Sequence, residues 1–173
     1  MTKIQNSKLG FTLIELLIVI SITTVLTTMV VANFRRGQTA QAVKTGGFDL
    51  ISKIREVQTL IHSGSLVDGV QTASGYELNF AIATPSTYTV KYSFGLGVTT
   101  TLETVTLPQN VVFSNFLVNG VSTNPVTVSI YPPFGKIYLN GNPNQNLSVE
   151  LNHQQTGEKR SVILDGVSGR VGF

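Results

Sequence analysis

A long apolar segment near the start of the chain constrains the fold most strongly. It runs from Phe11 to Ala32 and carries a single charged residue, Glu15. As a helix, these roughly 22 residues would measure about 33 Å, which is enough to cross a hydrocarbon core of about 30 Å. We therefore expect one transmembrane helix over residues 11–32.

Glu15 is out of place in such a segment. A carboxylate within lipid costs a few kcal/mol on insertion-based scales, so it is expected to have a partner or a function. In the alternative interpretation, Glu15 lies near the headgroups and reaches water. The segment is longer than the apolar part of a secretory signal, and no Ala-x-Ala cleavage site follows it. A generic membrane anchor would require neither Glu15 nor the preceding Gly10-Phe11 junction.

The residues around this junction, GFTLIE at positions 10–15, resemble the processing site of type IV prepilins and type II secretion pseudopilins. In that family a prepilin peptidase cuts after the glycine and N-methylates the new terminal phenylalanine. The glutamate at the fifth mature position then pairs with a terminal amine during assembly. The resemblance implies a leader over residues 1–10, cleavage between Gly10 and Phe11, N-methylation of Phe11, and an assembly role for Glu15.

Charge alone does not decide how the segment is oriented in the membrane. Lys3 and Lys8 precede it, whereas Arg35, Arg36 and Lys44 follow it, so the positive-inside rule does not favour the leader side. The resemblance implies a cytoplasmic leader and a C-terminal domain outside the cytoplasm, first in the inner membrane and then in a pilus or pseudopilus. Two roles remain open for the arginine pair, namely interfacial snorkelling and subunit contacts.

A helical pattern of apolar residues continues beyond the membrane segment. The stripe consists of Ala40, Val43, Leu50, Ile51, Ile54, Val57 and Ile61. Gly46 and Gly47 interrupt it and indicate a bend, because each glycine costs roughly 1 kcal/mol in a helix relative to alanine. Ser63 and Gly64 predict the end of the helix. We expect a helix of about 50 residues over 11–63, whose amphipathic half packs on a domain formed by residues 64–173.

The remainder of the chain is typical of antiparallel β-structure. Short segments rich in Val, Thr, Tyr, Phe and Ile alternate with turn signals such as Asn119-Gly120 and Asn140-Gly141. The predicted strands are residues 76–80, 88–94, 99–107, 111–118, 126–131, 136–139, 147–153, 161–164 and 169–173, with a polar loop over 140–146. The predicted fold class is α+β, with a long N-terminal transmembrane-plus-amphipathic helix packed on an antiparallel sheet. Pilins share this architecture.

Three further stretches resemble the GspH/FimT-type minor pseudopilins. They are residues 50–58, residues 130–141 and residues 161–171, and the last of them ends in Gly-Arg-Val. Some FimT-like members take part in DNA uptake through a C-terminal Gly-Arg-x-Arg tail, but here Gly172 takes the place of the second arginine. Lys159, Arg160 and Arg170 are therefore candidate nucleic-acid contacts if the last two strands pair. The alternative interpretation is an ordinary solvated hairpin.

No catalytic pattern occurs in the rest of the sequence. The chain lacks cysteine, which excludes a disulfide, a thiolate metal site and a cysteine nucleophile. The histidines His62 and His153 belong to no HExxH motif, and no GxSxG segment occurs. We interpret His62 as a charge at a helix end and His153 as a surface residue at a strand end. Asp68 and Asp165 are single acids in turns, too few for calcium. We predict no enzymatic activity, no cofactor and no metal site.

The sequence thus predicts a structural minor pilin or pseudopilin. The resemblance implies three partners: a prepilin peptidase, other pilin subunits and an inner-membrane assembly platform. The net charge of +3 includes Lys3 and Lys8, which leave with the leader, so we expect no nucleic-acid partner. A DNA-binding minor pilin for uptake is the alternative function, and an adhesin-like tip subunit is a further one.

Overall fold

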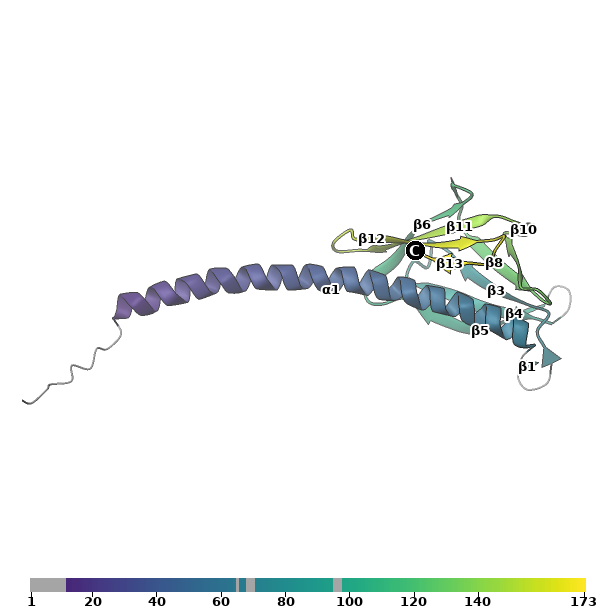
Figure 1. Cartoon of the computed structure of the whole chain (residues 1–173), viewed down its shortest axis with the longest axis horizontal. Coiled ribbons are helices and arrows are strands. Elements are labelled where there is room, and N and C mark those ends of the chain that lie inside the picture. The colour runs from purple at the N-terminus through teal and green to yellow at the C-terminus, as the bar shows by residue number, and fades with distance from the viewer. Residues whose placement is uncertain (1–11, 65, 68–70, 95–97) are drawn as a thin grey trace, which may run out of the picture. The chain divides into compact units, whose positions relative to one another are not determined.

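The computed structural model describes residues 12–64, 66–67, 71–94 and 98–173 (Figure 1). Gly10 and Phe11, where we predict cleavage and methylation, lie outside the described residues, as does Asp68. A single helix, α1 (Leu13–Ser63), spans 51 residues and ends at the residue where the sequence predicts its end. By its internal contacts the chain divides into two compact units, one up to Gln38 and the other from Thr39 to Phe173.

The first unit contains the N-terminal part of α1, which exposes its apolar side chains. Leu13 is 82% exposed and Met29 is 68% exposed, and by length and composition this helix is long and apolar enough to cross a membrane. Its hydroxyl groups are satisfied within the helix, since each donates a hydrogen bond to a carbonyl three or four residues earlier. These donors are Ser21, Thr23, Thr24, Thr27 and Thr28. The segment therefore needs no water to satisfy these groups.

The second unit contains two antiparallel sheets and a two-stranded ribbon, β1 (Leu66–Val67) with β2 (Gln71–Thr72). The larger sheet has the order β10 (Asn142–Pro143), β9 (Lys136–Leu139), β8 (Val126–Tyr131), β3 (Gly75–Phe80), β4 (Thr87–Ser93) and β5 (Thr99–Thr106). The smaller sheet has the order β13 (Val171–Gly172), β12 (Lys159–Asp165), β11 (Asn146–His153), β6 (Val111–Val118) and β7 (Val121–Ser122). These findings confirm the predicted α+β fold class.

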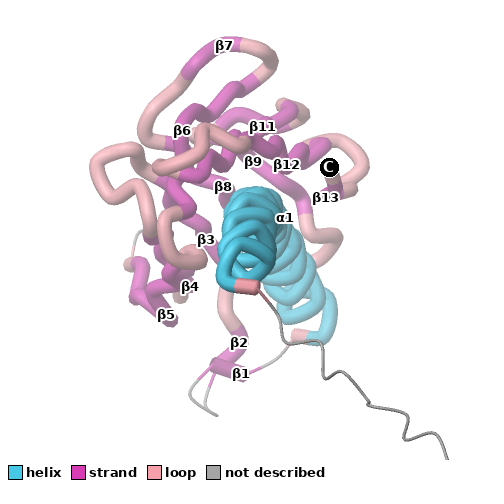
Figure 2. The backbone as a smooth tube through the Cα atoms, turned by 90° about the vertical axis from the view of Figure 1, so that its left-hand side faces the viewer, coloured by secondary structure: helices cyan, strands magenta, loops and turns pink. Residues whose placement is uncertain are grey.

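One hydrophobic core joins the two sheets and the C-terminal half of α1. Phe80 on β3 meets Phe113 on β6 with ring centroids 5.6 Å apart, so the sheets are in direct contact. The helix contributes its predicted stripe, of which Leu50 and Ile54 are almost fully buried. Two polar contacts attach α1 to both sheets: Lys53 Nζ lies 2.7 Å from Glu103 Oε1 on β5, and the Arg55 guanidinium donates to the Val171 carbonyl at 3.0 Å. Figure 2 shows β5 on one side of the helix and β13 on the other.

All nine predicted strands occur, with small shifts at their ends. The Asn119-Gly120 and Asn140-Gly141 pairs form the predicted two-residue turns, in which both residues have positive φ. The prediction of a continuous loop over residues 140–146 is wrong, because β10 pairs with β9 inside it. The strands that were not predicted, β1, β2, β7 and β10, have two residues each, which is too short for any periodicity to show.

Gly46 and Gly47 do not end the helix, because α1 continues through both residues. The two glycines instead allow close approach. A Cβ placed on Gly46 would lie 3.2 Å from Pro108 Cδ, and one placed on Gly47 would lie 2.5 Å from the Phe173 ring. Both positions therefore have little room for a side chain, and packing outweighs the low helix propensity of glycine.

The prediction for His153 is also wrong, since this residue is only 4% exposed rather than on the surface. It continues the inward-facing series of β11, in which alternate residues from Leu147 onward are buried. Its amide donates to the Glu158 carbonyl at 2.8 Å, and its Nδ1 lies 3.3 Å from Thr156 Oγ1. The strand alternation thus extends to its last residue and places an imidazole in the interior.

Candidate functional site

Glu15 lies at the start of α1, where its carboxylate caps the helix. The Thr12 amide and the Thr12 hydroxyl each donate to Glu15 Oε2 at 2.8 Å, and the Glu15 amide donates back to Thr12 Oγ1 at 3.3 Å. This reciprocal arrangement is a capping box, with Thr12 as the N-cap and Glu15 three residues later. The Thr-x-x-Glu spacing of residues 12–15 is the signal in the sequence from which this capping box could have been predicted.

The capped carboxylate is exposed and sits among exposed apolar side chains. Leu16, Leu17 and Ile18 follow it directly, and each is more than half exposed. Such a large apolar surface is unstable in water and requires either lipid or other apolar helices as its neighbours. In either environment a second hydrogen-bonding or cationic group near Glu15 would be favourable, because Thr12 occupies only one carboxylate oxygen.

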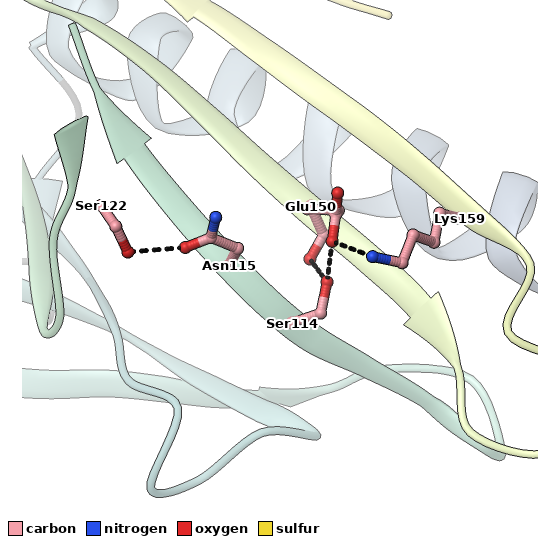
Figure 3. A network of polar contacts seen from close by, with 5 residues as sticks. All are labelled: Ser114, Asn115, Ser122, Glu150 and Lys159. Atoms are coloured by element: carbon pink, nitrogen blue, oxygen red, sulfur yellow. Dashed lines mark hydrogen bonds and ion pairs between the residues drawn. The ribbon is translucent and has the colours of Figure 1, made fainter. Parts of the chain in front are cut away.

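Lys159 forms an ion pair on the outer face of the smaller sheet. Its Nζ lies 3.0 Å from Glu150 Oε1, which also accepts a hydrogen bond from Ser114 Oγ at 2.6 Å (Figure 3). The Ser114 hydrogen bond, followed by the contact with Lys159, holds the pKa of Glu150 below its usual value. The Lys159 charge is therefore partly neutralised where it stands.

The three candidate nucleic-acid contacts do not form one patch. The last two strands pair as expected, but Arg170 lies opposite Asp165, whose amide donates to the Arg170 carbonyl at 2.9 Å. Arg160 is five residues back along β12, which corresponds to roughly 17 Å of extended strand. There the Arg160 guanidinium lies over the Phe173 ring, 5.7 Å from its centroid. Lys159 and Arg160 are neighbours on β12, but their side chains point to opposite faces of the strand, and Arg170 lies apart from both.

The two remaining polar candidates are His62, at the end of α1, and Asp165, at the turn between β12 and β13. His62 is exposed in the last turn of α1, at the position predicted from the sequence. The Asp165 carboxylate accepts the amides of Val167 at 2.8 Å and Ser168 at 3.0 Å, so it organises the β12–β13 turn. The backbone hydrogen bonds from Ser168 and then Val167 lower the pKa of Asp165. Among the described residues, no three His, Asp or Glu side chains are grouped to hold a metal ion.

The comparison with protein families identifies the N-terminal segment. Residues 5–31 match the model described as the prokaryotic N-terminal methylation motif. This motif is of the type IV prepilin kind and supports the pilin and pseudopilin family. It indicates a type IV pilin-like protein that is processed by prepilin peptidase, and the single apolar helix is consistent with an anchor in the inner membrane. No curated protein and no solved structure matches the chain.

Proposed function

We propose that this protein is a structural minor pilin or pseudopilin, assembled through its N-terminal helix into a type II secretion pseudopilus or a type IV pilus. One observation carries the proposal: the methylation motif over residues 5–31 includes the start of α1, where the apolar side chains are exposed and Glu15 is the only charge before Arg35. A membrane anchor that merely held the domain would have no use for this combination. A subunit that leaves the membrane and packs against others of its kind would use both features.

In this proposal, prepilin peptidase cuts between Gly10 and Phe11 and methylates Phe11. In the filament, the apolar surface of each helix contacts neighbouring helices instead of lipid, and dispersion contacts hold the bundle together. Glu15 fixes the axial position of each subunit relative to its neighbour, because a carboxylate in an apolar bundle is strongly destabilising unless it is paired. The amine of a neighbouring mature Phe11 is the partner that we assign to it. The C-terminal domain, from residue 64 onward, lies outside the cytoplasm and then on the outside of the filament.

We place the chain closest to the GspH/FimT-type minor pseudopilins. The support is the resemblance of residues 50–58, 130–141 and 161–171. Gln58 Nε2 donates to the Gly169 carbonyl at 2.9 Å, which joins the first stretch to the third. The inner-membrane assembly platform is a further proposed partner. DNA uptake, the alternative function, has less support, because Arg170 lies apart from Lys159 and Arg160.

Processing is the first test of the proposal. Co-expression of the full chain with a prepilin peptidase should yield a single product that begins at N-methyl-Phe11, as measured by intact mass. Replacing Gly10 by phenylalanine should block the cut, because a pocket shaped for glycine leaves no space for a ring. Gly37→Phe is the matched control, since no atom lies within 4 Å of a Cβ placed at Gly37. An uncleaved wild-type chain, or cleavage at another bond, would contradict the proposal.

Glu15 provides the second test, which must separate capping from subunit pairing. Glu15→Gln removes the charge that a neighbouring amine would recognise, whereas Thr12→Ala removes the hydroxyl contacts of the capping box and leaves that charge. If Glu15 acts through the neighbouring amine, Glu15→Gln should be made, inserted and cleaved normally but be largely absent from sheared filaments. Thr12→Ala should then enter filaments nearly as the wild type does. Equal incorporation of Glu15→Gln and wild type would refute the assembly role.

A further inference from the structure

The edge strands of the two main sheets differ in length. Three of the four, β7, β10 and β13, have two residues each, and β10 ends in a proline. The fourth, β5, has eight residues, and β4 is the only described strand that pairs with it (Figure 2). Proteins commonly keep edge strands short or place proline or lysine on them, because an unpaired edge is a template for another strand. β5 contains neither residue, so the described structure leaves one long edge unpaired.

The hydrogen-bonding pattern shows which main-chain groups of β5 point away from β4. The Leu107 amide donates to the Ser86 carbonyl at 2.8 Å, which continues the β4–β5 ladder beyond the end of the strand. In antiparallel pairs, residues bonded to the neighbouring strand alternate with residues whose amide and carbonyl face the opposite way. The register is regular from Glu103 to Thr106. Thr104 and Thr106 therefore direct their amides and carbonyls away from β4, where an added strand could bond to them.

The side chains of β5 favour an extended conformation and give the edge two different faces. Apart from Leu102 and Glu103, all of its residues are Thr or Val, which have high β propensity. Glu103 and Val105 are half-buried on the face towards α1, whereas Thr104 is exposed on the opposite face. A strand added to this edge would therefore direct alternate side chains towards α1 and towards solvent.

The face of this edge towards α1 is acidic. Glu56 and Glu103 each place a carboxylate oxygen 2.7 Å from Lys53 Nζ, so two carboxylates share one ammonium group. Asp49 is exposed one helical turn before Lys53, and the ion pairs of the described residues do not include it. Burial raises the pKa of Tyr88 on β4, and the charges of these three carboxylates raise it further, which places all three near the edge. Three carboxylates thus accompany one cation.

We propose that β5 binds an extended segment of a partner protein, which adds as an antiparallel strand and carries Lys or Arg at the positions that face α1. The main chain of the segment bonds to the amides and carbonyls of Thr104 and Thr106. Its basic side chains lie beside Asp49 and Glu56 and neutralise the excess negative charge. Its alternate side chains lie beside the exposed threonines, where β-branched residues pack well.

A second copy of this chain fits the edge less well. Antiparallel pairing of two β5 strands requires a twofold axis perpendicular to the sheet, so the acidic faces of both edges lie on the same side. Like charges then come together across the new pair, which is destabilising. A nucleic acid is disfavoured for the same reason, because its phosphates would meet carboxylates instead of cations. A basic segment is the partner whose charge complements this edge.

The test uses the full chain in a non-ionic detergent and a fluorescein-labelled, amidated Thr-Lys-Val-Lys-Val-Lys-Thr peptide, with fluorescence anisotropy as the readout. We expect saturable binding that weakens as salt is raised. Thr104→Pro removes an amide that points away from β4, which an edge strand tolerates, and should weaken binding about tenfold. Thr104→Val is the matched control, because it keeps that amide and a β-branched side chain, and its affinity should stay within about twofold of wild type.

A charge variant tests the other half of the proposal without altering the strand. Asp49→Asn should weaken binding about threefold, as expected for the loss of an exposed ion pair. Asp49 is exposed, so this variant should retain the wild-type melting temperature. Glu158→Gln is the matched control, because Glu158 is an exposed acid in the turn between β11 and β12, and its affinity should be unchanged.

Several results would overturn the proposal. These are absence of saturable binding up to about 1 mM peptide, equal affinity of Thr104→Pro and Thr104→Val, wild-type affinity in Asp49→Asn, and equal binding of a peptide with Glu in place of Lys. Sedimentation of the free chain provides the remaining one. Concentration-dependent dimers that Thr104→Pro abolishes would assign the edge to a second copy of the chain instead.

Discussion

Gly166 is the position where the structure makes its sharpest quantitative prediction. It follows β12, and a Cβ built on it would lie 2.0 Å from the carbonyl oxygen of Gln145. Backbone atoms surround this point, so the clash cannot be relieved by rotating a side chain. Ordinary contact begins near 3.4 Å, and Gly166→Ala must therefore push the two backbones apart by about 1.4 Å.

The expected cost follows from what that displacement disturbs. Overpacking of a close contact costs about 1–3 kcal/mol. The displacement also breaks the hydrogen bond from the Gly166 amide to Asn146 Oδ1, at 3.3 Å, which is worth about 1 kcal/mol. Gly166→Ala should therefore lower the free energy of unfolding by about 2–4 kcal/mol. Gly172→Ala is the matched control, because no atom lies within 4 Å of its Cβ, and the expected change is within about 1 kcal/mol.

Urea unfolding of residues 35–173, followed by far-ultraviolet circular dichroism, would measure both variants. We expect this fragment to fold as a monomer, because residues 39–173 form one compact unit with its own core. A Gly166→Ala variant that matches Gly172→Ala within about 0.5 kcal/mol would refute the reasoning, since it would mean that the Gln145 backbone can yield without cost. A lower slope against urea would instead indicate a change in the compactness of the unfolded or the native state, or unfolding that is no longer two-state.

Two further predictions concern the polar surface of the same domain. The pKa of Glu150 is lower in the folded state than in the unfolded chain, so its contribution to stability is present above the unfolded value of about 4.3 and is lost as pH falls through the folded value. The free energy of unfolding of wild type should therefore fall more steeply below pH 4.3 than that of Glu150→Gln, and parallel curves would contradict this. In gel shifts with duplex DNA near physiological salt we expect no binding, because Arg170 lies apart from the other candidates. A shift that Arg170→Ala abolishes would favour the uptake function instead.

Local patterns in the sequence were sufficient to determine the elements. The apolar segment and the stripe that follows it predict α1, because helical periodicity is a property of consecutive residues. The strands and the Asn-Gly turns were predictable for the same reason, since alternation and positive φ depend only on neighbouring residues. The capping box of Thr12 and Glu15 belongs to this class as well, because it depends only on the Thr-x-x-Glu spacing of residues 12–15.

Tertiary packing decided the features that depend on residues far apart in the chain. Gly46 and Gly47 indicate a bend by propensity, yet Pro108 and the Phe173 ring make them close-contact positions in a continuous helix. The register of the last two strands sets Arg170 opposite Asp165, which no local pattern specifies.

The hydrogen bond from Gln58 to the Gly169 carbonyl likewise depends on tertiary packing, because it joins residues that are 111 positions apart in the sequence. The sequence by itself thus predicted a long N-terminal helix followed by antiparallel strands. Only the tertiary structure decided which charges lie together, because the burial of one core sets the strand register and the helix position simultaneously.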